Sequence, residues 1–301
     1  RVSSMFLNLI KIVKYKNFDL IFSAGDHLNA IVLLSAIISR SSIKISCSSR
    51  VTPYDTYSNI IFSKGWILKI IMRLVMHRAD VLSCVSKDMV HQYKKIFRNS
   101  KHVPIYNIVK DSESEIKINE NLNEDWLTNK KFPTIIAAGM LEPWKGFSDL
   151  ILAFSKLLNH TKAKLIILGD GSLRLKLEKQ IKDLKLEEHV KLKGYVENPL
   201  KYFNLANVFA LSSYVEGMPN VLIEAMMAGC TPVSTNCETG PREILSSGRY
   251  GYLVPTNNPE ALCNGLLKAI KNPINKDILN EAVNLFQDKN VIKEHFKQLG
   301  I

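Results

Sequence analysis

The sequence has no long apolar run, few cysteines and no leader-like start. No stretch reaches the roughly 18 apolar residues that a membrane-spanning helix needs, and residues 28–38 are instead typical of a buried crossover helix. The five cysteines are scattered and never spaced as CxxC, which argues against a zinc site or disulfide framework and fits a reducing cytoplasm. The chain begins at Arg1 without a signal-peptide pattern, so we interpret it as lacking its start or as a fragment.

Length and apolar content favour two lobes. At 301 residues the chain is long for one hydrophobic core and short for three, and 46% apolar residues are enough to bury a sizeable core. No internal repeat or low-complexity segment is visible. We therefore expect two α/β lobes.

Basic residues are concentrated in the first third of the chain. Residues 1–110 contain 17 Lys and Arg against 5 Asp and Glu, whereas residues 111–301 contain 23 of each kind, so the net charge of +12 arises in the first part. A basic lobe suits nucleic acid, an acidic substrate or an anionic membrane surface. No recognition-helix or aromatic-basic motif supports nucleic acid. We expect peripheral contact with an anionic membrane; the alternative is that these lysines only aid solubility.

The first lobe alternates apolar runs with helical patterns, which is typical of a parallel sheet covered by helices. Residues 1–110 form this lobe, and residues 111–131, a polar stretch with six acids, form a linker. Its expected strands are residues 18–23, 43–48, 81–85 and 104–109, and its expected helices are residues 28–39 and 61–77.

The second lobe, residues 132–280, repeats the alternation more clearly, and a last helix over residues 281–301 is expected to pack towards the first lobe. Ligands of such sheets bind where the strands end, and we expect a cleft there between two Rossmann-like lobes. Expected strands are residues 134–138, 163–168, 190–192, 208–211, 231–234 and 251–254, and expected helices are residues 147–158, 173–184, 200–205, 221–228, 241–245 and segments from 259 onwards.

Two glycine-containing loops leave the first strands of this lobe. Gly139 to Phe147 carries Lys145 just before a helix start, where amides and an ammonium together suit a diphosphate. Gly169 and Gly171 follow the next strand and let the backbone pass close to a ligand. The alternative is a pair of ordinary strand-to-helix turns.

The most informative loop joins two carboxylates through a helix start. Glu216 follows a strand, a Gly-Met-Pro-Asn turn comes next, and Glu224 lies eight positions further, inside the helix. Helix-start amides can hold phosphate, while carboxylates accept hydrogen bonds from sugar hydroxyls. The alternative is a capped helix with two solvated glutamates. A fourth loop, residues 236–243, enters its helix through Pro241 and is a candidate wall of a sugar pocket or simply a well-formed helix start.

These residues resemble family 4 of the glycosyltransferases with the GT-B fold, especially bacterial enzymes that build surface polysaccharides, such as O-antigen, and lipid-linked oligosaccharides. Glu216 and Glu224 are similar to the family's E-x7-E signature, residues 236–245 to its TDCPTGPREIL segment, and Lys145 with Gly146 to its KGF element. The resemblance implies that Lys145 neutralises the donor diphosphate, that Glu216 contacts the transferred sugar and that Glu224 contacts the ribose. The implied donor-binding set is Gly139, Gly169, Gly171, Gly217, Met218, Pro219, Asn220, Val221, Leu222 and Glu224.

The resemblance is weaker in the first lobe and shows two departures. Arg50 follows a segment similar to the family's acceptor-side SER motif, and His27 lies where some members keep a functional histidine; the alternatives are a surface arginine and a structural histidine. Met140 stands where the family usually has arginine, which removes one cation from the diphosphate site. The opening strands and acceptor loop, roughly 60 residues, are expected to be absent.

The expected function is retaining transfer of a hexose or N-acetylhexosamine from a nucleotide diphosphate sugar, with UDP as the expected nucleotide, to a lipid-linked or polysaccharide acceptor. No DxD-like motif is present, so we expect no metal or other cofactor. The expected location is the inner face of the plasma membrane. The alternatives are a non-catalytic remnant that binds sugar nucleotides, and a GT-B epimerase or phosphorylase.

Overall fold

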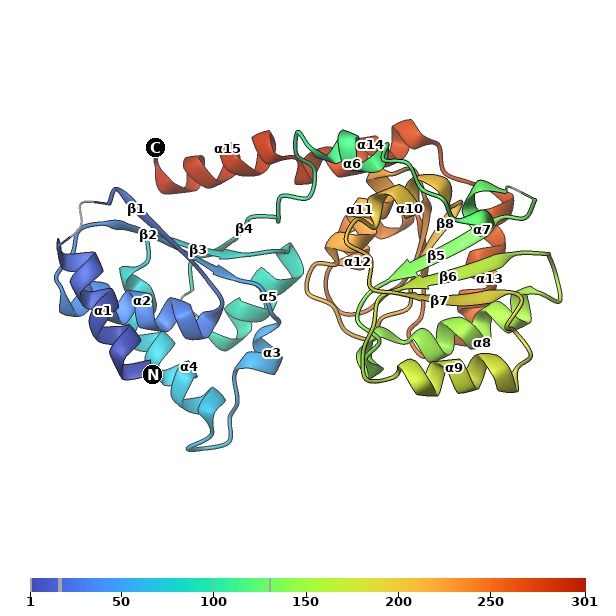
Figure 1. Cartoon of the computed structure of the whole chain (residues 1–301). Helices are drawn as coiled ribbons and strands as arrows, with labels where there is room; N and C mark the ends of the chain where they lie inside the picture. The colour runs from blue at the N-terminus through green and yellow to red at the C-terminus, as the bar shows by residue number, and fades with distance from the viewer. Residues whose placement is uncertain (1, 16–17, 99, 130) are drawn as a thin grey trace. The chain divides into compact units, whose positions relative to one another are not determined.

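The computed structural model describes residues 2–15, 18–98, 100–129 and 131–301, without the side chains of residues 2–5 and 15. The chain divides into two compact units. Unit 1 comprises Arg1–Asn107 and Val291–Ile301, and unit 2 comprises Ile108–Asn290. Each unit is built on its own parallel sheet, as the alternation of apolar runs and helices predicted (Figure 1).

Unit 1 has four parallel strands in the order β1-β2-β3-β4. Helix α2 packs against β1 and β2, and α5 packs against β3 and β4. The C-terminal helix covers the opposite side from α2 (Figure 1), where Val291 and Leu299 join a core with Val81 and Ile105. Its elements are β1 (Leu20–Ala24), β2 (Lys44–Ser49), β3 (Val81–Cys84), β4 (His102–Pro104), α1 (Val2–Tyr15), α2 (Asp26–Ile38), α3 (Pro53–Thr56), α4 (Lys64–Val75), α5 (Lys87–Ile96) and α15 (Asp288–Leu299).

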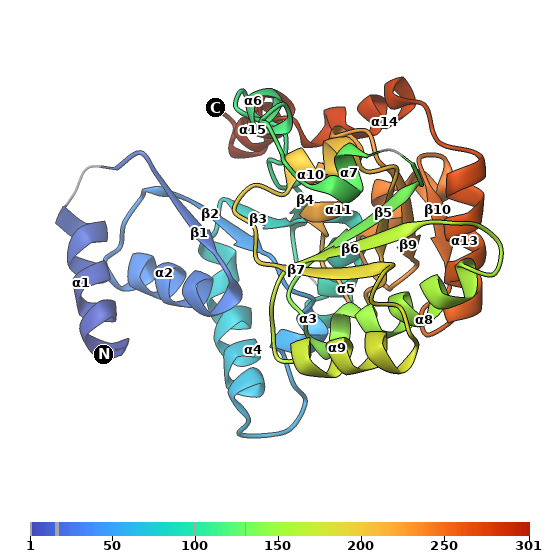
Figure 2. The same ribbon diagram turned by 45° about the vertical axis from the view of Figure 1, so that its right-hand side comes forward.

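Unit 2 has six parallel strands in the order β10-β9-β8-β5-β6-β7. The contacts place α8, α9 and α13 together, and α10 and α11 cover the other face of the sheet (Figures 1 and 2). Its elements are β5 (Thr134–Ala138), β6 (Lys164–Leu168), β7 (Val190–Gly194), β8 (Val208–Leu211), β9 (Thr231–Thr235), β10 (Tyr252–Val254), α6 (Ser114–Ile118), α7 (Asp125–Thr128), α8 (Phe147–Leu157), α9 (Arg174–Asp183), α10 (Leu200–Leu205), α11 (Asn220–Met227), α12 (Pro241–Ile244), α13 (Pro259–Lys271) and α14 (Lys276–Val283).

The uniform apolar strands of unit 2 explain its parallel sheet. All five residues of β5 and all four of β8 are buried, which is the pattern of strands covered on both faces. Leu150, Ile151 and Phe154 of helix α8 pack against these strands in one hydrophobic core, and their side chains are fully buried. This packing fixes the positions from which the loops at the strand ends leave.

The strand expected over residues 104–109 was wrong in its position. Strand β4 ends at Pro104, opposite Cys84, which is also the last residue of β3. The amide of Ile105 donates one more hydrogen bond to the carbonyl of Cys84, at 2.9 Å, where β3 itself ends. Helices α1, α3 and α5 were not among the expected elements.

Residues 111–131, interpreted from the sequence as a linker, contain α6 and α7 and lie within unit 2. The side chain of Glu124 is buried and accepts hydrogen bonds from Lys191 and Lys193 on β7, each at 2.6 Å. Not all acids of residues 111–131 are therefore solvated, because Glu124 connects this segment to the sheet of unit 2.

Candidate active site

An ion pair links two loops at the strand ends of unit 2. The ammonium of Lys145 donates to Oε1 of Glu216 at 2.6 Å, and the hydroxyl of Ser213 donates to the same oxygen at 2.6 Å. The Glu216 side chain is 10% exposed and that of Lys145 is 16% exposed. The pair is thus largely removed from water, which strengthens its electrostatic interaction, yet both groups keep some access to solvent.

Backbone contacts bring these two residues together although they are far apart in sequence. The amide of Tyr214 donates to the carbonyl of Trp144 at 2.8 Å, and the hydroxyl of Ser212 donates to the carbonyl of Lys145 at 2.8 Å. Gly146, between Lys145 and α8, has φ 65°, and a β-carbon there would overlap the carbonyl oxygen of Ser212. Only glycine permits this approach of the loop to the end of β8.

The glycines of the first two loops hold the loops against each other. Gly169 has φ 128°, and a β-carbon on it would overlap the carbonyl oxygen of Gly139. A β-carbon on Gly171 would lie 2.7 Å from the backbone nitrogen and the carbonyl oxygen of Leu141. The sequence interpretation gave these glycines a ligand-facing role. In the structure, the packing of one loop on the other is by itself enough to require glycine at positions 169 and 171.

The fourth loop packs on the third. The hydroxyl of Thr239 donates to the carbonyl of Glu216, and a β-carbon on Gly240 would lie 2.8 Å from the carbonyl oxygen of Gly217. Burial first, and then the charge of the nearby Glu216, raise the pKa of the Cys237 thiol to about 12. The loop thus supports the backbone of Glu216 and carries a thiol that stays protonated.

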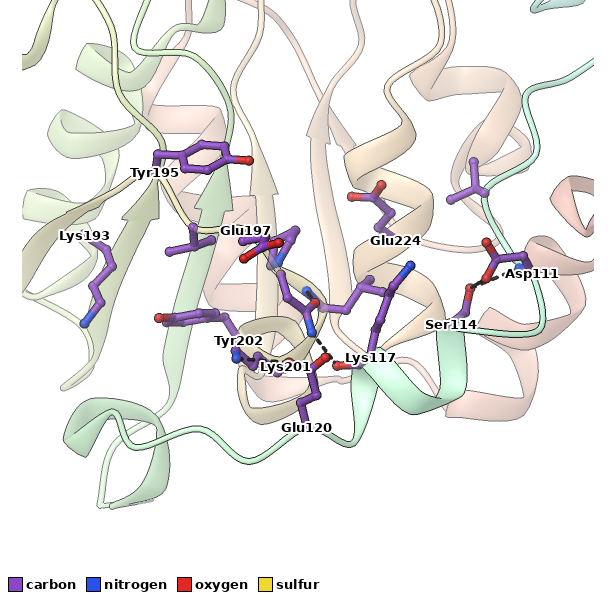
Figure 3. A pocket seen from close by; sticks show the side chains of 15 residues that line it. Asp111, Ser114, Lys117, Glu120, Lys193, Tyr195, Glu197, Lys201, Tyr202 and Glu224 are labelled. Atoms are coloured by element: carbon purple, nitrogen blue, oxygen red, sulfur yellow. Dashed lines mark hydrogen bonds and ion pairs between the residues drawn. The ribbon is translucent and has the colours of Figure 1, made fainter.

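Glu224 lies in a separate cavity of about 730 Å³ within unit 2. It projects from α11 and faces the loop that carries Tyr195 and Glu197 (Figure 3). Helix α6 closes one side with Lys117, whose ammonium pairs with Glu113 at 2.7 Å. Burial raises the pKa of the Glu224 carboxyl, so the protonated form is favoured more than for a solvated glutamate.

A smaller cavity of about 310 Å³ adjoins the first, because Tyr195, Val196 and Pro199 line both. Its other side is formed by the ends of β5 and β6, including Gly139 and Gly169. Met140 also lines it, with an exposed side chain. The cavity therefore lies at the carboxyl ends of two central strands, where open α/β sheets bind ligands.

The candidate residues around the start of α11 are divided between core and surface. Met218 and Leu222 are buried in the core, whereas Asn220 and Val221 are half-buried at the first turn of the helix. The first amides of a helix have no acceptor within it, so this turn is suited to an anion. Gly217 and Pro219 shape the turn that precedes it.

The two candidate residues of unit 1, Arg50 and His27, lie in different surroundings. Arg50 is exposed directly after β2. His27 is exposed on the first turn of α2 and lines an apolar cavity of about 570 Å³ with residues of α2 and α4. Nothing in these surroundings assigns either residue a chemical role.

Sequence reasoning missed a buried carboxylate in unit 1. Asp26 is 5% exposed, and it accepts hydrogen bonds from Ser49 at 2.5 Å, Tyr57 at 2.8 Å and Tyr93 at 2.5 Å. Burial first, and then the charge of Asp26, raise the pKa of both tyrosines. The only local signal was the position of Asp26 after a strand, because its partners come from three other segments.

The described residues also bear on metals and membranes. Within these residues no group of three or more His, Cys, Asp or Glu side chains is arranged to hold a metal ion. In the same part of the chain, no helix combines the length and the apolar content needed to cross a bilayer.

Comparison with known proteins gives the class and the family. Two solved structures share the fold: the lipopolysaccharide outer core galactosyltransferase WaaB, with a TM-score of 0.75, 19% identity and coverage of 99% of this chain and 79% of that one, and the Anabaena protein HepE in complex with UDP, with a TM-score of 0.78, 18% identity and coverage of 99% and 81%. The fold is therefore the GT-B fold of glycosyltransferases.

Residues 118–285 match the family described as Glycosyl transferases group 1, and the chain belongs to this family. A Campylobacter jejuni relative, N-acetylgalactosamine-N,N'-diacetylbacillosaminyl-diphospho-undecaprenol 4-alpha-N-acetylgalactosaminyltransferase, is 31% identical over 85% of this chain and 68% of its own length. An uncharacterized glycosyltransferase of Methanocaldococcus jannaschii is 28% identical over 95% of this chain and 76% of its own. The predicted GT-B fold class and the predicted relation to glycosyltransferases of surface glycans are confirmed.

Proposed function

We propose that this glycosyltransferase moves a hexose or N-acetylhexosamine, with retention, from a nucleotide diphosphate sugar to a lipid-linked or polysaccharide acceptor in cell-surface glycan synthesis. The observation that carries the proposal is the Lys145–Glu216 ion pair at the strand ends of unit 2. An ammonium beside helix-start amides suits a diphosphate, and an adjacent carboxylate suits sugar hydroxyls. The Campylobacter jejuni relative, named for an undecaprenol-linked substrate, supports the lipid-linked alternative for the acceptor.

In the proposed reaction the bond from the anomeric carbon to the diphosphate oxygen breaks, and a bond to the acceptor hydroxyl forms on the same face. The leaving diphosphate takes the proton of that hydroxyl. Lys145 stabilises the charge that develops on the leaving group, and Glu216 orients the sugar. This division of roles needs no protein nucleophile.

The nucleoside end of the donor is assigned to the cavity that holds Glu224, with the carboxyl accepting from the ribose hydroxyls. UDP is the proposed nucleotide, in keeping with the UDP bound in the HepE structure. No metal or other cofactor is included in the proposal. On the sequence resemblance alone, Arg50 and His27 are proposed for the acceptor side. The enzyme is proposed to act at the inner face of the plasma membrane through peripheral contact with anionic lipid.

The test is turnover of nucleotide sugars by the purified chain with lipid-linked and oligosaccharide acceptors. Replacing Glu216 with Ala should abolish transfer and leave the fold, followed by circular dichroism, intact. Chelation with EDTA should leave the rate unchanged. Unaltered turnover in the Glu216→Ala variant removes this residue from the site.

A second candidate is a protein that binds sugar nucleotides without catalysis, which Met140 favours because it supplies no cation to the diphosphate. Binding of a nucleotide sugar without release of nucleoside diphosphate in the presence of acceptors would support this candidate. Dependence on free sugar or inorganic phosphate would instead indicate an epimerase or phosphorylase.

A further inference from the structure

Three consecutive large apolar side chains stand in solvent at the tip of unit 1. Ile60 is 74% exposed, Ile61 63% and Phe62 82%, in the loop that leads into α4. Exposing three such side chains together is unfavourable in water, and contiguous apolar patches of this kind usually mark an interaction site. We call residues 58–63 the apolar loop.

Local contacts hold this loop in one conformation. The hydroxyl of Ser58 accepts from the amide of Ile60 at 3.0 Å, and that of Ser63 caps α4 by accepting from Trp66 at 3.2 Å. A β-carbon on Gly65 would lie 2.9 Å from the amide nitrogen of Ser58, so helix and loop are in close backbone contact. The apolar side chains are thus presented by a well-supported turn.

The backbone of Phe62 points to the same conclusion. Its φ of 64° lies in the left-handed region, which a bulky side chain rarely adopts. The Phe62 ring lies 5.7 Å from that of Trp66, centroid to centroid. An unfavourable backbone conformation that also directs an aromatic ring into water is not accounted for by the stability of the unit itself.

Helix α4 continues the apolar surface beyond the loop. Leu68, Met72 and Val75 are buried and attach the helix to unit 1. On its other side Ile67, Ile70 and Leu74 are exposed at a spacing that places them on one face. The helix therefore has one apolar stripe for the core and a second one for solvent.

The charges around this surface are of one sign. Residues 58–75 contain Lys64, Lys69 and Arg73 and no Asp or Glu. Helical spacing places Lys64 and Arg73 on either side of the exposed stripe. Lys64 also occupies the first turn of α4, where the helix dipole favours an acid, so helix stability does not explain it.

We propose that the apolar loop and the outer face of α4 insert into the interface of an anionic lipid bilayer. Aromatic and aliphatic side chains at the tip enter the boundary between headgroups and acyl chains, and the flanking cations bind lipid phosphates. The absence of acids from residues 58–75 favours lipid over a protein partner. The inference rests on the membrane contact in the proposed function and identifies the element that makes it.

Sedimentation with vesicles tests the proposal. The whole chain should bind vesicles of equal parts phosphatidylcholine and phosphatidylglycerol. The triple variant Ile60→Ser, Ile61→Ser, Phe62→Ser should bind at least about tenfold more weakly, since three apolar side chains no longer enter the lipid. The double variant Lys64→Gln, Arg73→Gln should lose about tenfold on these vesicles and little on pure phosphatidylcholine.

The matched control is Leu175→Ser, which removes a side chain that is 80% exposed in unit 2 and should leave vesicle binding unchanged. Equal vesicle binding by the parent and the triple serine variant overturns the proposal. A change confined to oligomeric state in gel filtration also overturns it, because the patch then joins copies of the chain. Turnover with a water-soluble acceptor, measured on the same samples, separates a failure of the proposed glycosyltransferase activity from a failure of lipid binding.

Discussion

Each unit has a carboxylate just beyond the end of a parallel strand, and the two carboxylates are stabilised by different kinds of partner. In unit 2, Glu216 is paired with the Lys145 ammonium and remains partly accessible. In unit 1, Asp26 is buried and accepts only from neutral hydroxyl and amide groups among the residues that the structure describes. The two sites occupy similar places in similar sheets but differ in charge and access.

The difference separates a site suited to chemistry from one suited to support. An ammonium already held by a carboxylate can turn towards an incoming diphosphate without first being stripped of water. A carboxylate surrounded by serine and tyrosine hydroxyls has no free side to offer a substrate, but it joins the ends of β1 and β2 to α3 and α5 through its partners. Position at the strand ends alone therefore does not identify a catalytic carboxylate.

The largest effect is expected at the ion pair of unit 2. Lys145→Met should lower the rate of transfer by about 10² to 10³ fold, because the leaving diphosphate loses its cation. Steady-state release of nucleoside diphosphate measures the change. The matched control is Lys156→Met, which breaks a 2.6 Å pair with Glu260 on the exposed surface of the same unit.

The control should transfer sugar at the parental rate, since exposed ion pairs contribute little. A similar loss in both variants would mean that Lys145 acts only through stability, and the functional contrast between the two carboxylates would disappear. Urea unfolding of both variants distinguishes the two outcomes.

A stability effect is expected at the carboxylate of unit 1. Asp26→Ala should destabilise unit 1 by about 3 kcal/mol, because buried hydroxyls of Ser49, Tyr57 and Tyr93 lose their shared acceptor. Urea unfolding measures the loss. Asp55→Ala, at an exposed position in α3, should change stability by less than about 0.5 kcal/mol. Unchanged stability in Asp26→Ala would contradict the supporting role.

The units should also respond differently to acid. Burial, with a smaller contribution from Lys94, lowers the pKa of His102 in unit 1 to about 4. Between pH 6.5 and about 4, His102 is protonated in the unfolded chain but neutral in the folded chain. The free energy of unfolding therefore falls as the pH drops through this range, by at most about 3 kcal/mol. Glu224 in unit 2 has the opposite pH dependence. Because its pKa is raised in the folded state, the free energy of unfolding falls as the pH rises through the range in which carboxyl groups titrate.

Hydrogen exchange of peptides from each unit, compared at pH values above and below this window after correction for intrinsic rates, measures the contrast. His102→Phe should remove the acid sensitivity of unit 1 and leave unit 2 unchanged. If that variant keeps the full sensitivity, another group of unit 1 is responsible.

Unit 2 was easier to predict than unit 1 for physical reasons. Strands 134–138 and 208–211 and helix 200–205 were predicted at the observed bounds. Both strands are apolar and buried along their whole length, Gly139 follows the first of them, and Pro199 precedes the helix. In unit 1, β4 is short and ends at Pro104. Weak local signals gave misplaced or missing elements there.

The sequence predicted only those features of the site that depend on residues close together in the chain. Glu216 and Glu224 are eight residues apart on one strand-to-helix turn, so sequence alone places them on adjoining segments, whereas the structure places Glu224 in a separate cavity. The pairing of Lys145 with Glu216 depends on how two loops pack, and the partners of Asp26 come from residues up to 67 positions away. No spacing rule reports such contacts, because sheet order and loop packing create them.

The smallest expected effect concerns Met140, which lines the cavity at the ends of β5 and β6 with its side chain exposed. Met140→Arg should lower the KM for the donor about fivefold, since one added cation near the diphosphate in a solvated place contributes about 1 kcal/mol. Met140→Gln, similar in length but neutral, should leave the KM unchanged. Raising the salt concentration should erase the gain, because an exposed charge is screened. If arginine and glutamine act alike, the donor diphosphate lies elsewhere in unit 2, and Lys145 is no longer its natural partner.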